Sequence, residues 1–590
     1  MKRKYISLFL SAIMLLSVQL IHAQQKYVQI PTPKRVVPIE GVYVDDAGKY
    51  DTTQFRLKDD IIFRTIRDDA VNRTLGDGTV YVLKRNNVYV CASTIDQQFL
   101  DIYIQGEDGE GRMPLILHNN PPGTGAQGQA FIRAQQNCYF ENFEFDARNP
   151  DNSYGNRAMD FRGPNTQVII KGCRFTDDRG GGVTIEAAGL NLKMYVYDCF
   201  IGNQGHYRSS GGNGRAIDIR LPAGGNLDSL VFKNNTLYNL TDRVVRSMGD
   251  ITKYMEFDHN TIINNQGVHG CIQLGNAKEA VITNNIFANP ITLGNRKATL
   301  LNLDGQPVQQ RGEQSQEPDN KDLPDAAFAI VTHNGIKGRL LQEDIVGITV
   351  RNNNIFFEQE FLDLFAANPK VFDTPDVRVA SEAVRANLVG DPAKMSFTER
   401  LPFDYNDTDA GNLGTVSSYK DLVEVTKAFI EDPGAVIYPE NWSLIYPHEW
   451  DASYPASSIS YTAADGGYPL GDLNWFPDDK AKWLSGASKS MAPAANNPAG
   501  IEINQTYPNP FVTEATINYS LLFDQNVEIG VYNFMGQKIG AVKNGNMKRG
   551  TYVFTWDGKG NNGNSLPVGI YYFVISGSSG QVGTKLVKSK

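Results

Sequence analysis

The stretch Asn234-Asn235-Thr236-Leu237 returns as His259-Asn260-Thr261-Ile262 and again as Asn284-Asn285-Ile286-Phe287, which places three asparagines 25 residues apart. The slot of the second residue is held further upstream by Cys199, Cys173 and Phe143. A fixed repeat of roughly 20–50 residues is typical of solenoid proteins. Because each repeat contains short β-favouring runs and no helical spacing, the repeat predicts a β-solenoid.

Stacking explains why one slot of the repeat stays polar. Neighbouring coils of a β-solenoid lie about 4.8 Å apart, so equivalent amides can donate and accept hydrogen bonds along a ladder inside the coil. We therefore expect Asn260 to be buried between Asn235 and Asn285. Cys173 and Cys199 share the slot on successive coils, which leaves two alternatives open, stacked thiols or a disulfide.

The composition narrows the class of protein. A chain of 590 residues has room for more than one domain. The formal net charge of −9 disfavours nucleic acid and anionic membrane surfaces as partners. The 55 glycines and the 21% of charged residues are typical of a loop-rich folded protein, which we expect to be a monomer.

The N-terminus reads as a targeting segment. Lys2, Arg3 and Lys4 precede a mostly apolar run at 6–21, and Ile21-His22-Ala23 is similar to a cleavage site. This pattern predicts a signal peptide at 1–23, with a membrane anchor as the alternative. No later stretch is long and apolar enough to span a bilayer, so we expect an exported mature protein without a transmembrane segment.

The rest of the chain divides into four predicted segments. We expect an all-β fold in which a right-handed parallel β-helix with a short N-terminal capping helix precedes a small β-sandwich. Isoleucines at helical spacing place the capping helix at 59–73, where it would cover the open end of the solenoid. The predicted boundaries are 24–358 for the capped β-helix, 359–484 for a segment that caps its C-terminal end or runs back along it, 485–500 for a linker and 501–590 for the sandwich.

One strand of each coil aligns over five repeats, at 157–162, 181–186, 215–220, 243–248 and 270–275. Alternation then fixes which side chains point inward and which point outward. The predicted outward file is Asp160, Thr184, Asp218, Arg246 and Gln273. A neighbouring outward file is Arg162, Glu186 and Arg220.

The last segment resembles the C-terminal sorting domain of the type IX secretion system of Bacteroidota. The motifs that carry the resemblance are Tyr507-Pro508-Asn509-Pro510-Phe511, the stretch 531–537 (VYNFMGQ), Trp556-Asp557-Gly558, the stretch 566–572 (LPVGIYY) and the tail Lys585-Leu586-Val587-Lys588. The resemblance implies passage across the outer membrane by that machinery, acting through 501–590, and delivery to the medium or the cell surface.

The repeating body resembles the pectate-lyase-like superfamily of parallel β-helices, on its asparagine slots, its apolar rows and its coils of about 25 residues. Its arrangement is similar to that of chondroitinase-B-like and alginate-lyase proteins, and residues 468–475 (YPLGDLNW) are similar to the closing segment of secreted β-helix proteins from the same bacteria. The chain departs from the lyase pattern, because Met248 and Gln273 stand where that family has its lysine and arginine. Of the pectin hydrolase pattern only Asp177-Asp178 and Gly205-His206 are present.

The outward file supplies the candidate chemistry. Asp160 and Asp218 are two coils apart, about 9–10 Å, at the edge of the range of inverting glycosidases. Arg246 beside Asp218 would lower the pKa of that carboxyl and favour an ion pair. The candidate catalytic residues are Arg246, Asp218 and His206. The candidate substrate-binding residues are Arg220, Arg243, Tyr207, Arg208 and Gln273.

Two functions are compatible with these residues. The first is an exported protein whose β-helix engages an extended polysaccharide and cleaves it as a lyase or hydrolase. The second is a non-catalytic surface or matrix protein that binds glycan or serves as a structural spine. The sequence contains no zinc-ligand spacing, phosphate loop or nucleophile elbow. It predicts no metal site and leaves the cofactor open, calcium included.

Overall fold

The computed structural model describes most of the chain from Lys26 onward. The described residues are 26–45, 48–72, 78–97, 99–118, 130–146, 157–176, 183–204, 214–221, 225–240, 243–247, 251–265, 271–274, 276–290, 328–329, 347–369, 384, 387–403, 451–486, 501–521, 524–533, 537–548, 550–561, 563–577 and 580–589. They form two compact units, one reaching to Tyr454 and including 463–487, the other combining 455–462 with 488–590. The predicted signal peptide and most of the predicted linker lie outside the described residues. So do residues 304–325, whose Gln, Glu, Asp and Pro residues predict an exposed insertion, and residues 420–430, whose pattern predicts a helix.

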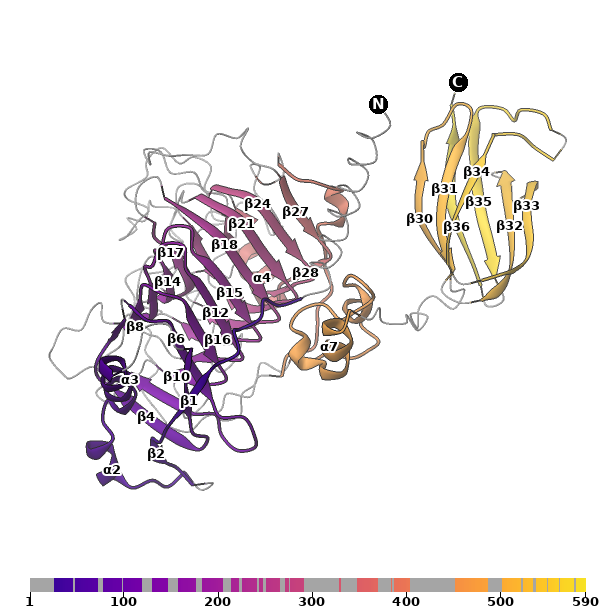
Figure 1. The fold of residues 1–590 in the computed structure, drawn as a ribbon. Coiled ribbons are helices and arrows are strands. Elements are labelled where there is room, and N and C mark those ends of the chain that lie inside the picture. Colours follow the sequence, from indigo (N-terminus) through magenta and orange to yellow (C-terminus); the bar gives the residue numbers. More distant parts are fainter. Residues whose placement is uncertain are drawn as a thin grey trace, which may run out of the picture. The chain divides into compact units, whose positions relative to one another are not determined.

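The first unit is a right-handed parallel β-helix, as the repeat predicts (Figure 1). Its strands stack into three sheets, and within the described residues every pair of them is parallel except β2–β4, which is antiparallel. The first sheet contains β1 (Arg35–Ile39), β3 (Thr79–Leu83), β6 (Ile102–Gly106), β9 (Cys138–Glu141), β12 (Gln167–Lys171), β15 (Lys193–Tyr197), β18 (Asn226–Lys233), β21 (Ile251–Asp258), β24 (Asn276–Thr283) and β27 (Gly347–Arg351).

The other two sheets complete each coil. The second contains β2 (Val42–Tyr43), β4 (Asn87–Cys91), β7 (Leu115–His118), β10 (Glu144–Asp146), β13 (Arg174–Thr176), β16 (Phe200–Gln204), β19 (Thr236–Leu240), β22 (Thr261–Asn265), β25 (Ile286–Ala288), β28 (Asn353–Phe356) and β29 (Ser396–Phe397). The third contains β5 (Ile95–Gln97), β8 (Ala130–Ala134), β11 (Arg157–Phe161), β14 (Val183–Ala187), β17 (Arg215–Ile219), β20 (Val245–Ser247), β23 (Ile272–Gln273) and β26 (Phe328–Ala329).

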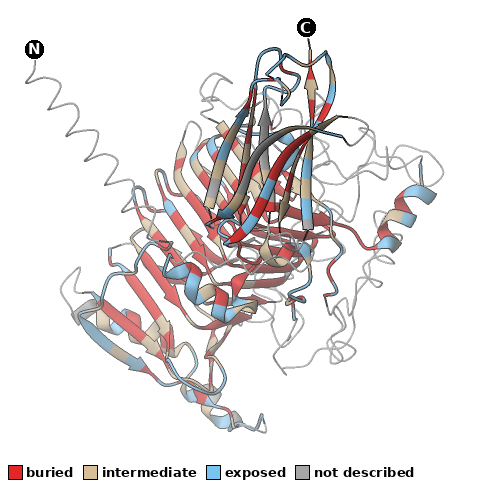
Figure 2. Ribbon diagram, turned by 90° about the vertical axis from the view of Figure 1, so that its right-hand side faces the viewer, coloured by how far each residue is buried: buried red, intermediate tan, exposed pale blue. Residues whose placement is uncertain are grey.

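Buried residues follow one another along the strands of the coils (Figure 2), and their apolar side chains form one core that extends from Ile39 to Met395. Helix α3 (Ile61–Asn72) covers the N-terminal end, as predicted, and its Ile62 and Ile66 belong to this core. A shorter helix, α2 (Thr52–Leu57), precedes it. Helix α4 (Gln359–Ala367) follows the last regular coil. No described helix is long and apolar enough to cross a membrane.

The predicted asparagine ladder is confirmed. The side-chain nitrogen of Asn235 donates to Asn260 Oδ1 at 2.9 Å, and that of Asn260 donates to Asn285 Oδ1 at 3.0 Å. The side-chain nitrogen of Asn285 donates in turn to Asn353 Oδ1 at 3.0 Å. At its other end, Asn235 Oδ1 accepts from the backbone N–H of Cys199. All five cysteines are buried free thiols, so the slot holds stacked thiols and no disulfide.

The residue before each ladder position has left-handed backbone. Its φ is positive in every such coil, at Asn142, Gly172, Asp198, Asn234, His259, Asn284 and Asn352. Asparagine, aspartate, histidine and glycine tolerate this conformation better than other residues, which explains the first letter of the repeated phrase. A second asparagine row, Asn239, Asn264 and Asn289, has the same 25-residue spacing and its own side-chain hydrogen bonds.

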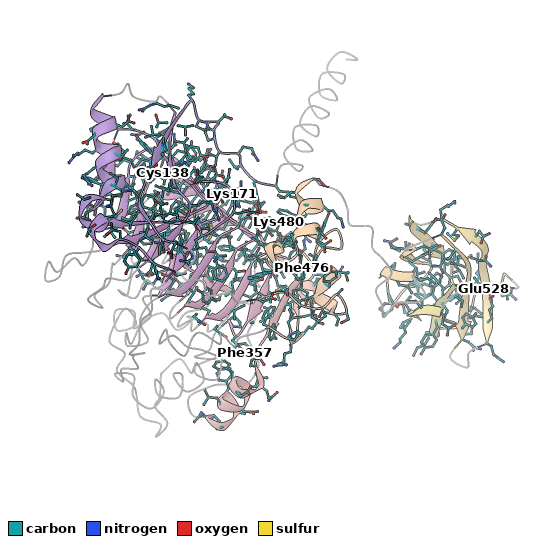
Figure 3. The ribbon with its side chains drawn as sticks, turned by 90° about the horizontal axis from the view of Figure 1, so that it is seen from below. Cys138, Lys171, Phe357, Phe476, Lys480 and Glu528 are labelled. Atoms are coloured by element: carbon teal, nitrogen blue, oxygen red, sulfur yellow. The ribbon has the colours of Figure 1, made fainter. Side chains whose placement is uncertain are left out.

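Residues 463–484 run back along this turn row, one of the two courses that the sequence allows for the 359–484 segment. Gly471 N donates to Asn284 O, and Leu473 N donates to Asn234 Oδ1. Lys480 pairs with Asp198 at 2.7 Å, three coils before Asn284 (Figure 3 labels Lys480 and Phe476). The segment ends in helix α7 (Pro477–Leu484). We call 463–484 the return segment.

The N-terminal end of the described chain lies beside helix α7. Tyr27 stacks on Tyr197 with ring centroids 4.3 Å apart and meets the edge of Trp483 at 5.9 Å. Its hydroxyl donates to Asp198 Oδ1 and accepts from Asn234 Nδ2, both at 2.6 Å. These contacts hold the beginning of the chain and the return segment on the same turns.

The second unit is a small antiparallel β-sandwich. One sheet contains β30 (Ile501–Tyr507), β31 (Ala515–Leu521) and β34 (Gly550–Trp556), and the other contains β33 (Lys538–Met547), β32 (Gln525–Asn533), β35 (Gly569–Gly577) and β36 (Gly580–Lys588). Apolar residues of both sheets form its core. Alternation in the sequence predicts β31, β32, β34 and β35, at 515–521, 527–532, 551–555 and 570–575, and does not predict β30, β33 or β36.

Candidate functional site

The outward file of the third sheet is a row of charged side chains. The strand register places Asp96 beside Arg133, Arg133 beside Asp160, Asp160 beside Glu186 and Glu186 beside Asp218. Asp218 pairs with Arg246, and the pairing of Val245 with Ile272 puts Gln273 next to Arg246. We call Asp96, Arg133, Asp160, Glu186, Asp218, Arg246 and Gln273 the charged row.

The structure corrects the predicted file at one coil. Glu186, and not Thr184, pairs with both Asp160 and Asp218. The prediction aligned 181–186 two residues out of register. A shift of two residues leaves every side chain on its expected face, so alternation cannot detect it. Three carboxylates therefore lie on successive strands, where the sequence predicted two separated by a threonine.

Asp218 is the centre of an arginine cluster. It is fully buried and accepts from Arg220 Nε at 2.7 Å, from Arg215 Nη1 at 3.1 Å and from Arg246 Nη1 at 3.2 Å. Burial by itself raises the pKa of Asp218, but Arg215, Arg246 and Arg220 outweigh it, and the pKa lies below its usual value. Asp218 is therefore an ionised, hydrogen-bonded carboxylate.

Asp160 has a similar arrangement two strands away. It is fully buried and accepts from Arg162 Nε at 2.9 Å and Arg162 Nη2 at 2.7 Å. Arg133 Nε contributes a longer contact of 3.4 Å. The hydrogen bond to Asp160 raises the pKa of Arg162. Planar two-point pairing of this kind fixes the orientation of a guanidinium as well as its charge.

Two of these arginines are open to solvent. Arg162 is 44% exposed and Arg220 is 45% exposed, whereas Arg246 is 12% exposed. Glu186 lies 3.9 Å from Arg220. Asp160, Glu186 and Asp218 are thus buried beside exposed guanidinium groups, whereas Asp96, at one end of the row, is 43% exposed.

The remaining predicted residues have different surroundings. Arg243 and Gln273 are both buried, and Gln273 Oε1 accepts from Ser247 N at 3.2 Å, so neither side chain is open to a polymer in this structure. His206, Tyr207 and Arg208 lie outside the described residues. The structure thus brings Asp218, Arg220 and Arg246 together, and the roles predicted for all eight residues stay predictions.

Sequence reasoning missed three charged members of this site. Asp96 and Arg133 belong to the same file, but the aligned strands began at residue 157 and left out the two earlier coils. Arg215 was recognised as a strand residue, yet its ion pair with Asp218 was not predicted. Alternation assigns Arg215 and Asp218, which are three residues apart, to opposite faces of the strand, so no pattern in the strand indicated this pair. Among the described residues no group of three or more His, Cys, Asp or Glu side chains could hold a metal ion.

Comparison with known proteins bears mainly on the second unit. Residues 515–581 match the FlgD Ig-like domain family. No curated protein matches the chain. Among solved structures, dimeric latent PorU from Porphyromonas gingivalis matches with 20% identity over 15% of this chain and 9% of that one. Its TM-score is 0.14, so this likeness carries no argument.

Proposed function

We propose that this protein is exported and engages an anionic polysaccharide along the outer face of the third sheet. The observation that supports the proposal is the pairing of two exposed guanidinium groups, those of Arg162 and Arg220, with two buried carboxylates of the charged row, Asp160 and Asp218. Arg162 and Arg220 would bind acidic groups of the polymer, and Arg246, on the strand after Asp218, would add its charge. Arg243 and Gln273 are buried and would support the site from beneath. A long polymer suits this face, because the charged row crosses successive strands of the third sheet and so follows the axis of the β-helix. His206, Tyr207 and Arg208, which precede β17 in the sequence, would contribute further contacts.

Binding without cleavage is the form of this function that the geometry favours. A general acid must hold a proton near neutral pH, and Asp218 has a lowered pKa and three arginine partners. Arg246 is an ion-pair partner of Asp218, and guanidinium groups stay protonated in proteins. Cleavage through Arg246, Asp218 and His206 is the second candidate, and it would need His206 or another group to move the proton.

We also propose that 501–590 is the sorting domain that its motifs resemble. The separated motifs meet in the folded sandwich, which supports this assignment. Phe511 N donates to Val587 O, and Asn509 Nδ2 donates to Lys585 O. Lys588 Nζ donates to Gly558 O at 3.1 Å and to Leu566 O at 2.9 Å. Four of the five motifs therefore form one contact network.

A screen of uronic-acid polymers tests the proposed function. Affinity electrophoresis measures binding, and absorbance of unsaturated product at about 235 nm, the range where such products absorb, follows cleavage by elimination. Reducing-end assays follow hydrolysis. We expect binding to at least one polymer and no binding to the same polymer after its carboxyl groups have been reduced. Failure to bind or cleave any of them would leave a structural spine as the function.

A further inference from the structure

We propose that Asp160 and Asp218 are positioning residues that hold Arg162 and Arg220 in place for an acidic ligand and do not themselves touch it. This inference rests on the proposed function. In it the two carboxylates hold the arginines in place and do not transfer protons. It also makes the two exposed arginines, and not the two aspartates, the residues that contact the ligand.

Burial separates the two kinds of group. Both carboxylates are fully buried, and their principal arginine partners are close to half exposed. A polymer on the surface would therefore meet the guanidinium groups first. Burying a carboxylate is favourable only when it is paired, so each aspartate requires its arginines as much as it orients them.

The two aspartate–arginine pairs have the same construction. In each, the arginine follows the aspartate by two residues and donates through Nε, at 2.9 Å in Arg162 and 2.7 Å in Arg220. Residues two apart on a strand share a face, and the two strands are separated by one strand, β14. The two arginine positions therefore lie two coils apart, about 9–10 Å along the axis.

The donors left over are suited to a ligand. Arg220 pairs through Nε, and Arg162 through Nε and Nη2. Three donor nitrogens have no hydrogen-bond partner among the described residues. They are Nη1 and Nη2 of Arg220 and Nη1 of Arg162. Fixed guanidinium donors bind carboxylate or sulfate groups with less loss of conformational entropy than mobile ones.

Replacing either aspartate by asparagine separates positioning from net charge. Asp218→Asn and Asp160→Asn each make the protein more positive, which by simple attraction would strengthen binding of a polyanion. If the carboxylates position the arginines, the same variants bind more weakly. Asp69→Asn is the matched control, because Asp69 makes a two-point pair with Arg35, which is 44% exposed and belongs to the first sheet.

The first measurement is affinity electrophoresis in gels that contain polygalacturonate or alginate, with circular dichroism to verify folding. We expect binding by Asp160→Asn and Asp218→Asn to weaken about tenfold, and binding by Asp69→Asn to stay at the wild-type level or rise slightly. Equal or tighter binding by both row variants overturns the proposal. Asp218 also pairs with the buried Arg215. If Asp218→Asn fails to fold for this reason, Asp160→Asn alone decides the test.

The second measurement needs no polymer. Phenylglyoxal modifies arginine side chains, and mass spectrometry gives the rate at each position. We expect Asp218→Asn to raise the rate at Arg220 severalfold and Asp160→Asn to raise it at Arg162, each without changing the rate at Arg35. Unchanged rates overturn the positioning role even if polymer binds. If wild type binds no polymer and the rates rise as expected, the proposed function fails and the positioning of the arginines stands.

Discussion

The hydroxyl of Thr236 donates a 2.7 Å hydrogen bond to Asp472 Oδ2, across 236 residues of sequence. Thr261, in the same place on the next coil, accepts from the backbone N–H of Asp472 at 2.9 Å. One residue of the return segment thus joins two coils at the residues that follow the ladder asparagines. The contact is buried, and its chemistry gives the first prediction.

Replacing Asp472 by asparagine should change how stability depends on pH. Burial, the largest cause, raises the pKa of Asp472 to about 7 in the folded protein, above its ordinary value of 3.8. A carboxyl whose pKa is raised by folding stabilises the fold below the unfolded pKa, and this stability is lost as pH rises to the folded pKa. As pH rises from about 4 to about 7, the ionisation of Asp472 should therefore lower the free energy of unfolding by about 1.4 kcal/mol for each pH unit.

The measurement is the urea midpoint of the β-helix at several pH values from 4 to 8. Asp472→Asn should flatten the decline over this window, because asparagine does not titrate. Its amide can still accept from Thr236. An identical decline in wild type and variant would mean that Asp472 is ionised throughout the window.

Asn260→Leu should destabilise the ladder from the inside. Leucine removes the acceptor of Asn235 and the donor to Asn285, and each buried polar group left unsatisfied costs about 1–3 kcal/mol. Thermal unfolding of the β-helix measures the effect. Asn526→Leu, on an exposed position of β32, is the control and should leave this transition unchanged. A melting temperature equal to wild type for Asn260→Leu would contradict the ladder.

Arg246→Ala should weaken both binding and stability. From the sequence alone, Arg246 and Asp218 are predicted to form a surface ion pair, which would stabilise the fold by about 0–1 kcal/mol. The structure buries Asp218, so losing one of its arginines should cost more, about 1–3 kcal/mol. Polymer affinity should fall about tenfold, equivalent to 1.4 kcal/mol. Arg35→Ala is the control, and an unaltered affinity in Arg246→Ala would remove this residue from the site.

Deleting 501–590 should stop export and leave the β-helix folded. The truncated protein should accumulate in the periplasm of its native host, because the deleted residues carry all the motifs that resemble the sorting domain. Its thermal transition should match that of the β-helix in the full chain, since the two units have separate cores. Fractionation and immunoblotting measure the distribution. Normal amounts in the medium would refute the sorting role.

Sequence patterns predicted the parts of the fold that depend on local chemistry. The asparagine slots predicted the interior of the coils because a buried amide needs a partner on the next coil. Isoleucine spacing predicted α3, which covers the open end. The row of Asn239, Asn264 and Asn289 has the same 25-residue spacing as the ladder. It was not predicted from the sequence, although these asparagines follow two residues after each repeated phrase.

The charged row was harder to predict because it depends on register between coils. Loops of unequal length separate the strands, and an alternating pattern fits equally well after a shift of two residues. That shift hid Glu186 between Asp160 and Asp218. Burial of Asp218 was also beyond the pattern, since a charged outward residue on a strand is ordinarily solvated. The partners of the return segment are hundreds of residues away, and no local rule pairs Asp472 with Thr236.

The course of the return segment bears on the order in which the parts of the protein fold. Solenoid coils interact mainly with their neighbours, so the coils could stack one after another from the N-terminal side. Lys480, Asp472 and Gly471 connect coils at Asp198, Asn234 and Asn284 to a segment that is made near the end of synthesis. These late contacts have high sequence separation, which slows folding. The chain should thus stay easy to unravel until its last third has emerged, and then close into a single cooperative block.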